Sequence, residues 1–454
     1  MENLTDRTLT KERKKGTIQK NPERGVCVLD KITEQLKDFL DNAHSVYHSV
    51  SALEWMLEEA GYTCLTEGAQ WELYPGGKYY LTRGGSALMA FRIPYGAPVG
   101  FMMSASHSDR PTFKVKENGE LTGTYTRLAT EKYGGMLMGT WLDRPLSVAG
   151  RVLVDTPMGV QSRLVDIDKD LLLIPNVAIH MNRKANDEQS FNPAVDTIPL
   201  MGSKESAGKF WDMLKEQAGG EILGHDLYLY IRQKASVWGI NEEYISSAAL
   251  DDLACAWCCL HGFLNAEESQ AIPVYCVFDS EEVGSCSMQG AASTFLEHSL
   301  EKICTVLGLD TYAMFSDSFM LSADNGHAIH PNHPEYADPK NAPVMGQGVV
   351  LKFNANQRYT TDGVSAAVFR KICEKADVPV QTYCNRADIP GGSTLGNISL
   401  AKVSVPTADI GLPQLAMHSC YETAAVADVV HLCDAMRAFY SSALSVSEGN
   451  YRII

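Results

Sequence analysis

The sequence has no apolar run that approaches the roughly 20 residues needed to cross a membrane as a helix. Its first residues, MENLTDRTLTKERKK, also lack the apolar core of a secretory signal. Basic residues are outnumbered, with 39 Lys and Arg against 55 Asp and Glu, which gives a net charge of −16. Because phosphate groups require a basic surface, this balance argues against nucleic acid or an anionic membrane as the main partner. The one dense basic segment, KERKK at residues 11–15, is interpreted as a solvated tail.

Cysteine is sparse, at 12 of 454 residues, and several cysteines lie inside apolar runs. A free thiol in such a run behaves as a small hydrophobic group, so we expect a reducing, cytoplasmic compartment. Cys255 and Cys258 form a Cys-x-x-Cys pattern, which occurs in zinc and redox sites. The chain has no second pattern of this kind and no turn residue between the two cysteines, which favours the interior of a helix.

A length of 454 residues suggests two or three domains. Apolar residues recur at helical spacing in residues 30–60, where Gly61 ends the pattern, and helices are also predicted at 247–264, 364–376 and 423–446. Short apolar segments predict strands at residues 78–83, 87–93, 99–109, 271–278, 311–316 and 348–354. Alternating strands and helices of this kind are typical of an α/β domain.

The middle of the chain has a different pattern. Short segments at 113–128, 144–154 and 168–181 predict antiparallel strands, and residues 186–196 predict a long loop. We therefore predict a discontinuous α/β domain formed by residues 1–112 and 240–454. A β-rich domain of residues 113–239 is inserted between its two halves.

Acidic and imidazole side chains follow several of the predicted strands, and sites in open α/β sheets form beyond the carboxyl ends of strands. His107 and Asp109 end the strand GFMMSASHSD. Residues two apart face the same way, so Asp109 can orient the His107 ring, as metal-binding histidines usually require. The alternative is a loop histidine beside a solvated acid.

Two further acidic pairs have ordinary explanations as well as functional ones. Asp251 and Asp252 stand in the first turn of a predicted helix, where the helix dipole alone favours acids. Glu281 and Glu282 follow the strand PVYCVF as neighbours on a turn, so their side chains diverge. One can bind a metal while the other reaches a bound water, although a charged, solvated loop would look the same.

Histidines complete the candidate set. Asp324 lies close in sequence to His327, His330 and His333, and His418 precedes the last predicted helix. Two histidines with three or four carboxylates suit Zn²⁺ or a similar divalent ion, rather than a thiolate-rich or an all-oxygen site. With one shared carboxylate, two metal ions about 3.5–4 Å apart become plausible.

At these residues the sequence resembles the M18 family of metallopeptidases, the aspartyl aminopeptidase and vacuolar aminopeptidase group. The resemblance covers most of the chain, from HSDRP at residue 107 onwards. Its most specific motifs are LDDLA, SEEVGS, SADNGHAIHPN, KFNANQRYTTDG, PGGSTLG and PQLAMHS. It departs from the family pattern at Arg110, where a small residue is expected, and in a shorter segment at residues 334–346.

The resemblance implies a zinc-peptidase α/β core, a mixed sheet flanked by helices, with an inserted β-rich dimerisation domain. It also implies homo-oligomers, in the form of tetrahedral dodecamers built from dimers. The implied ligands of one zinc ion are His107, Asp251 and Asp324, and those of the second are Asp251, Glu282 and His418. Glu281 is implied as the general base and Asp109 as the acid that orients His107. Substrate-contacting positions are matched by His327, Lys352 and Tyr359, and His180 matches a histidine that reaches the site of a neighbouring subunit.

The implied reaction is removal of the N-terminal residue from peptides with a free N-terminus, with two Zn²⁺ per subunit, or Co²⁺ or Mn²⁺ in their place. Lys352 could pair with an acidic first residue, but the family includes preferences for acidic and for neutral residues, so both stay open. A related carboxypeptidase or amide deacylase is an alternative, for which Arg358 or Arg386 could hold a substrate carboxylate. A catalytically silent assembly scaffold is another, but it would have no need for Glu281.

Overall fold

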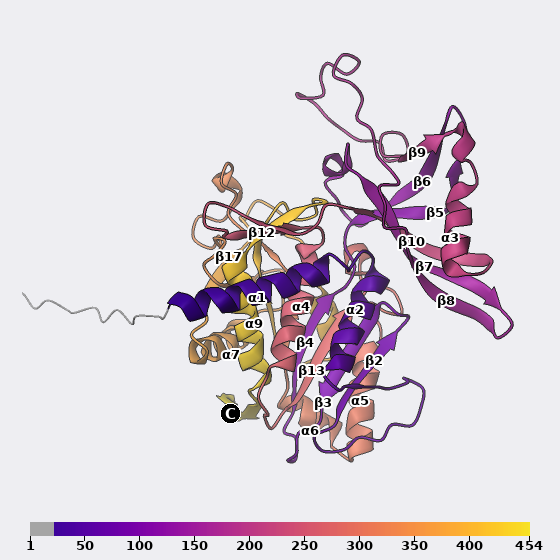
Figure 1. Cartoon of the computed structure of the whole chain (residues 1–454). Helices are drawn as coiled ribbons and strands as arrows, with labels where there is room; N and C mark the ends of the chain where they lie inside the picture. The colour runs from indigo at the N-terminus through magenta and orange to yellow at the C-terminus, as the bar shows by residue number, and fades with distance from the viewer. Residues whose placement is uncertain (1–21) are drawn as a thin grey trace, which may run out of the picture.

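The computed structural model describes residues 22–454, with helices and strands arranged around three main sheets (Figure 1). The basic segment at residues 11–15 therefore lies outside the described residues. Within the described part of the chain, no helix is both long and apolar enough to span a membrane. The eleven cysteines whose side chains the structure describes are all free, and Cys255 and Cys258 are buried inside a helix, as predicted.

The core of the chain is a mixed sheet of nine strands. In spatial order they are β1 (Thr63–Cys64), β2 (Lys78–Arg83), β3 (Ala87–Arg92), β13 (Ile272–Phe278), β4 (Phe101–His107), β14 (Phe319–Ala323), β18 (Thr407–Gly411), β16 (Val349–Phe353) and β17 (Val380–Cys384). The central strands β13, β4 and β14 run parallel and are buried along their whole length. Continuous apolar runs suit such strands because helices cover both faces of the sheet.

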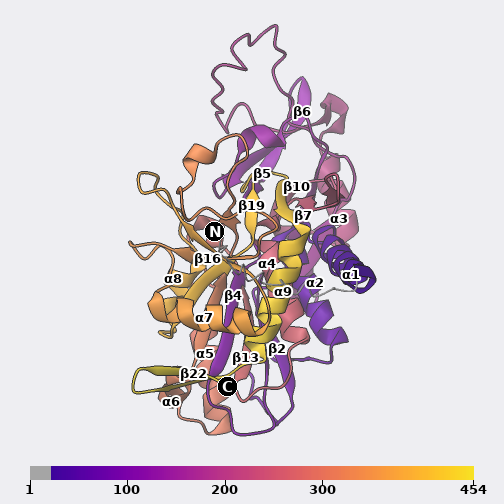
Figure 2. The same ribbon diagram turned by 90° about the vertical axis from the view of Figure 1, so that its left-hand side faces the viewer.

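Helices pack on the two faces of this sheet and form two separate hydrophobic cores. One face is covered by α1 (Pro22–Leu40), α2 (Val46–Glu59), α4 (Leu250–Leu264), α7 (Gly363–Lys375) and α9 (Val426–Tyr440). The other is covered by α5 (Phe295–Leu307), α6 (Thr311–Ser316) and α8 (Leu395–Leu400). Successive strand residues alternate between the cores, so Tyr275 packs with α4 and Cys276 with α5. Figure 2 shows α9 running alongside α4.

A second, six-stranded sheet is built from the middle of the chain and projects from the core (Figure 1). Its strands are β8 (Gly159–Asp166), β7 (Leu146–Thr156), β10 (Ile222–Ile231), β5 (Thr112–Leu121), β6 (Tyr125–Tyr133) and β9 (Leu200–Ser203), each antiparallel to its neighbours. The sheet has its own core, to which Phe210 and Leu214 of helix α3 (Lys209–Ala218) contribute. The chain thus has a mixed α/β core with an additional β-rich domain, and the boundaries predicted for it stay a prediction.

Two small sheets complete the fold. A five-stranded sheet contains β11 (Ser236–Trp238), β12 (Tyr244–Ser247), β20 (Glu422–Ala425), β19 (Pro413–Leu415) and β15 (Gly326–His327). Near the end of the chain, β21 (Leu444–Ser447) and β22 (Asn450–Ile453) form a hairpin. Short 3₁₀ helices lie at Met138–Trp141, Lys204–Ser206, Glu281–Val283 and Pro334–Tyr336.

Most of the predicted elements are confirmed, but three predictions were wrong and several elements were not predicted. Residues 311–316 form helix α6 and not a strand, because the Asp310 side chain accepts hydrogen bonds from the backbone N–H of Tyr312 and Ala313 and caps a helix there. The last helix is α9, shorter than predicted, because Glu422–Ala425 pairs with β12 as a strand. Residues 175–199 form a loop where a strand was predicted up to residue 181. Helices α3, α5 and α8 and the core strands β1, β14, β17 and β18 were not predicted.

Candidate active site

Three parallel strands of the core sheet end at the same edge, and each delivers a candidate residue there. His107 is the last residue of β4, and it lies opposite Phe278, the last residue of β13. The Glu281–Val283 turn follows β13 immediately, and Asp324 follows β14. Because carboxyl ends of parallel strands meet at one edge, side chains far apart in the sequence converge.

The structure brings all five predicted metal ligands together. His107, Asp251 and Asp324 place one ligand atom each within 4.8 Å of one another, and so do Asp251, Glu282 and His418. Asp251 belongs to both groups. Its Oδ1 lies 3.5 Å from His107 Nε2, whereas its Oδ2 lies 3.4 Å from His418 Nε2. The two oxygens of one carboxylate therefore face two different imidazoles.

Glu281 lies at the same place, because it forms a third such group with His107 and Glu282. The sequence predicted that these neighbouring side chains diverge, yet one ligand atom each of Glu281 and Glu282 lies within 4.8 Å of the other and of His107. Glu282, unlike Glu281, also belongs to the group with Asp251 and His418, and its Oε1 lies 3.5 Å from His418 Nε2. The geometry permits one of the two glutamates to bind a metal while the other accepts and donates a proton.

The donor atoms fit divalent cations. Asp251 Oδ1 is buried and makes no hydrogen bond to any residue that the structure describes. Burial and the surrounding carboxylates raise the pKa of Glu281 to about 8, and burial raises that of Asp324 to about 6. Burial opposes ionisation of Asp251 too, but the His107 and His418 imidazoles hold its pKa below the usual range. Carboxylates crowded in a buried space are stabilised by a positive charge among them, and imidazole with carboxylate is a donor set that zinc favours.

Asp109 supports this site in two ways. The His107 Nδ1–H donates to the backbone carbonyl of Asp109 at 3.1 Å, which leaves Nε2 free to bind a metal. The Asp109 carboxylate lies 3.4 Å from the same ring nitrogen, but its main partners are elsewhere. Its two oxygens accept the backbone N–H groups of Glu281 and Glu282, each at 3.1 Å. Asp109 thus holds the glutamate turn as well as the histidine.

Sequence analysis missed Glu422, which holds two of the candidate ligands by their backbone. Its carboxylate accepts the N–H of Asp251 at 2.9 Å and the N–H of His418 at 2.7 Å. Burial raises the pKa of Glu422 to about 8. An acid in the otherwise apolar segment that follows His418 was the only signal in the sequence. Asp252 has a similar role, since its carboxylate accepts the N–H of His107 at 3.1 Å.

His327 stands at the end of β15 and lines a cavity of about 380 Å³ together with His330, His333, Tyr383 and Arg386. Arg386 is already neutralised, because its Nε and Nη2 donate to the two oxygens of Asp388 at 2.7 and 2.8 Å. Arg358, the other candidate clamp for a carboxylate, is exposed on a loop.

Lys352 is 1% exposed, so it is not the surface residue that its strand position permitted. Its Nζ donates to the Asp324 carbonyl at 2.8 Å and lies 3.7 Å from the Asp324 carboxylate. The same ammonium lies 5.1 Å from the centre of the Tyr359 ring. Lys352 therefore fixes the position of a candidate ligand, and Tyr359 packs against it.

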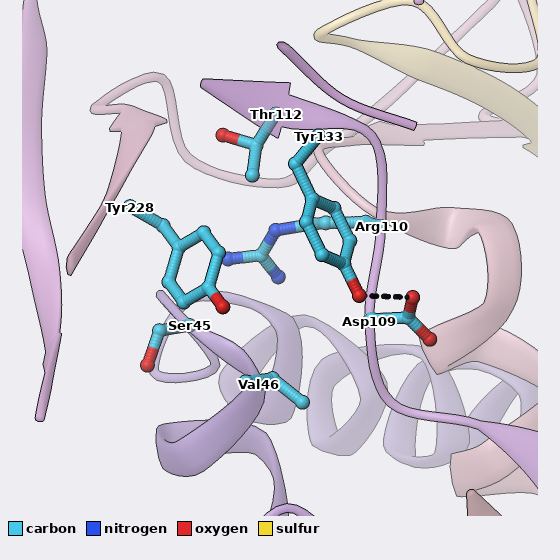
Figure 3. A pocket seen from close by; sticks show the side chains of 7 residues that line it. All are labelled: Ser45, Val46, Asp109, Arg110, Thr112, Tyr133 and Tyr228. Atoms are coloured by element: carbon cyan, nitrogen blue, oxygen red, sulfur yellow. Dashed lines mark hydrogen bonds between the residues drawn. The ribbon is translucent and has the colours of Figure 1, made fainter. Parts of the chain in front are cut away.

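His180 lies in the exposed loop between β8 and β9 of the six-stranded sheet. It makes no hydrogen bond or ion pair with any of the candidate residues in the part of the chain described. Arg110, the departure from the family pattern, donates from Nη1 to the Ala43 carbonyl at 2.7 Å. Its guanidinium group lies between the rings of Tyr133 and Tyr228 of the six-stranded sheet (Figure 3).

Comparisons with known proteins show a likeness over most of the chain. A probable M18 family aminopeptidase 2 of Clostridium novyi (strain NT) is 40% identical over 427 residues, which cover 90% of this chain and 99% of the relative. A chain of the Ape4 and Nbr1 complex, solved by cryo-electron microscopy, superposes with a TM-score of 0.88 at 33% identity, covering 91% of this chain and 86% of that one. A solved dodecamer of S. cerevisiae mApe1 superposes with a TM-score of 0.80 at 26% identity, covering 91% and 97%.

The sequence profile of one family spans nearly the whole core and the additional sheet. The family described as aminopeptidase I zinc metalloprotease (M18) matches residues 39–440. These residues include all the candidate ligands, and the relatives are aminopeptidases rather than carboxypeptidases, deacylases or scaffolds. The chain therefore belongs to the M18 family of zinc-dependent aminopeptidases.

Proposed function

We propose that the chain is an aminopeptidase with two zinc ions per subunit that share the Asp251 carboxylate. The observation that carries this proposal is the placement of Asp251 Oδ1 near His107 and of Oδ2 near His418, each within 3.5 Å. A carboxylate that faces two imidazoles from its two oxygens is arranged to bridge two ions. Asp324 completes one group and Glu282 the other.

Two zinc ions held by these groups would supply the Lewis acidity that lowers the pKa of a water molecule and polarises the scissile carbonyl. The protein's own part begins with Glu281, whose carboxylate takes the proton of the attacking water and later returns it to the leaving amine. Asp109 sets the position of this base, because it binds the backbone N–H of Glu281. His327, at the rim of the neighbouring cavity, donates a hydrogen bond to the oxygen that becomes negative.

The preferred first residue of the substrate stays open between acidic and neutral side chains. Lys352 is the cation closest to the ligands, but its ammonium already binds Asp324. An acidic substrate side chain would have to share this ammonium with Asp324. A neutral one would meet the His327 and Tyr383 rings in the cavity of about 380 Å³.

The family likeness also supports a homo-oligomer. A solved relative is a dodecamer, and we propose a tetrahedral dodecamer built from dimers for this chain, with the six-stranded sheet as the dimerisation domain. His180 then reaches the site of a neighbouring subunit from its exposed loop. Mass photometry should find a species of twelve chains of 49.8 kDa rather than a monomer. For the compartment, we propose the cytoplasm, which the free thiols of the described cysteines support.

The test of the proposed function uses peptides that differ only at their N-terminus. We expect release of the first residue from a free-amine peptide and none from its N-acetylated counterpart. Dialysis against a chelator should abolish turnover, and zinc, cobalt and manganese added back separately identify the active metal. A panel with Asp, Glu, Leu, Lys or Met as the first residue decides the preference. Hydrolysis of the acetylated peptide from its C-terminus would contradict the proposal.

A further inference from the structure

The glutamate turn is held from the six-stranded sheet as well as from the core. Tyr133 is the last residue of β6, and its hydroxyl donates to Asp109 Oδ2 at 2.8 Å (Figure 3). The same oxygen accepts the backbone N–H of Glu282, and Asp109 Oδ1 accepts that of Glu281. Asp109 therefore lies between a tyrosine of the six-stranded sheet and two amides of the turn that follows β13 of the core sheet.

The next residue presses on the same turn. Gly134 has a φ of +74°, and a Cβ added to it would lie 3.1 Å from Glu282 Cβ and 3.3 Å from Glu282 O. A residue with a side chain would thus be strained and crowded at this position. The end of β6 lies directly against the turn that carries Glu281 and Glu282.

We propose that Tyr133 is a positioning residue for the peptidase reaction, which fixes the Asp109 carboxylate and, through it, the turn that carries Glu281. The inference rests on the proposed role of Glu281 as the base. Without the tyrosine hydroxyl, the carboxylate would be anchored mainly by the two amides that it has to position. With the hydroxyl, it is tied to a strand of a separate sheet, and rigid elements hold catalytic groups more closely than loops do.

The Tyr133 side chain is itself held in place. Its ring packs edge-on against Tyr228 of β10, with the ring centres 5.7 Å apart and the planes at 81°. Both rings line a small cavity with Ser45, Thr112 and Arg110 (Figure 3). The Tyr228 hydroxyl makes no hydrogen bond to any residue that the structure describes, so it provides a matched control in the same cavity.

The test compares Tyr133→Phe with Tyr228→Phe in the full-length protein at saturating zinc. Tyr133→Phe keeps the ring, so we expect wild-type thermal stability, wild-type zinc content and nearly unchanged KM. Its kcat should fall about 10- to 100-fold, because displacement of a catalytic group by about 1 Å costs up to that factor. Tyr228→Phe should keep kcat within about twofold, because it loses a hydroxyl with no role in positioning.

A double-mutant cycle separates positioning through Asp109 from a general structural effect. In an Asp109→Asn background, Tyr133→Phe should cause no further loss of kcat, because the partner through which it acts is already altered. Additive losses, an unchanged kcat in the single variant, or a loss of zinc or of thermal stability together with kcat would each overturn the inference. Failure of the proposed function itself would look different, since Glu281→Gln would then retain turnover.

Discussion

The carboxyl edge of the nine-stranded sheet and the six-stranded sheet contribute to the site in opposite ways. The first gathers the candidate ligands: His107, Glu282 and Asp324 stand at or after its strands, and Asp251 and His418 join them from the start of α4 and from the segment between β19 and β20. His107, Asp251 and Asp324 are exposed by 1, 3 and 7%, whereas His418 is partly exposed. The second supplies no candidate ligand among the described residues, but it contacts the site through Tyr133, and through the Leu137 N–H that donates to the His418 carbonyl at 3.0 Å. One region therefore carries the chemistry, and the other holds it in place.

The joint between the two regions is polar and only half-buried. Asp226 of the six-stranded sheet accepts hydrogen bonds from Lys114 Nζ at 2.8 Å, Arg151 Nε at 2.9 Å and Tyr47 Oη of α2 at 3.1 Å. Asp166 of β8 pairs with His44 next to α2 at 2.5 Å. Loss of a partly solvated ion pair of this kind changes the free energy of unfolding modestly. Loss of a group at the buried site, in contrast, changes turnover by a large factor. The comparison therefore predicts effects of different kind and size in the two regions.

The largest effect is expected at Glu281. Glu281→Gln should lower kcat by about 10²–10⁴-fold, because it removes the general base without removing a ligand. Zinc content, measured by mass spectrometry of the purified protein, should stay at the wild-type level. The result would place the chemistry at the end of β13.

The neighbouring glutamate is the matched control. Glu282→Gln should lower zinc content, since Glu282 belongs to the group with Asp251 and His418. The experiment tests whether zinc content falls in Glu282→Gln while it stays at the wild-type level in Glu281→Gln. Equal loss of zinc in both, or full turnover in Glu281→Gln, would contradict the division of roles on this turn.

A smaller effect, on stability, is expected at the joint. Asp226→Asn should lower the free energy of unfolding at pH 7 by about 1–3 kcal/mol, because hydrogen bonds to a charged group are lost. The kcat of the folded variant should stay within about twofold of the wild type. Thermal and urea unfolding measure the first quantity, and steady-state kinetics the second.

The pH dependence of this stability difference tests the direction of the Asp226 contribution. Burial raises the pKa of Asp226, but Lys114 and Arg151 outweigh it and hold the pKa below the usual value. A lowered carboxyl pKa gives stability above the unfolded pKa of about 3.9, and that stability is lost as pH falls through the folded pKa. The difference between wild type and Asp226→Asn should therefore be full at pH 7 and shrink below about pH 4. A difference that grows in acid would contradict this account.

The smallest effect is expected at an exposed pair in the core region itself. Lys371 Nζ lies 2.6 Å from Glu374 Oε2 on α7, and both side chains are more than half exposed. Lys371→Ala should change the free energy of unfolding by less than about 0.5 kcal/mol and leave kcat unaltered. A larger change in either quantity would show that a position in the core region is enough to give a large effect, without burial at the carboxyl edge of its sheet.

The sequence predicted the candidate ligands because they follow apolar strands that are easy to recognise. His107 ends one such run and the Glu281–Val283 turn follows another, and the rule that parallel strands end at one edge brings them together. The strand before Asp324 was predicted at residues 311–316, but it lies at Phe319–Ala323. The shared Asp251 needed the family resemblance, because acids in the first turn of a helix are common without any metal.

The supporting residues could not be predicted in the same way. Tyr133 acts through a hydrogen bond to a residue 24 positions away, and Glu422 joins His418, four positions away, to Asp251, 171 positions away, so no local pattern reports either role. Residues 423–425 of strand β20 were assigned to the last predicted helix for a similar reason, since the pairing of this strand with β12 is long-range. Helix α6 is different, because Asp310 was a visible capping residue that outweighs the apolar run after it.

The most direct test of the central claim compares the zinc content of the wild-type protein with that of Asp251→Ala. Both proteins must be folded, and the variant must have the same thermal unfolding profile as the wild type. The account predicts about two zinc ions per wild-type chain, and the loss of both in the variant, because one carboxylate serves both groups. One zinc ion per wild-type chain, or a variant that keeps one ion at full occupancy, would contradict it.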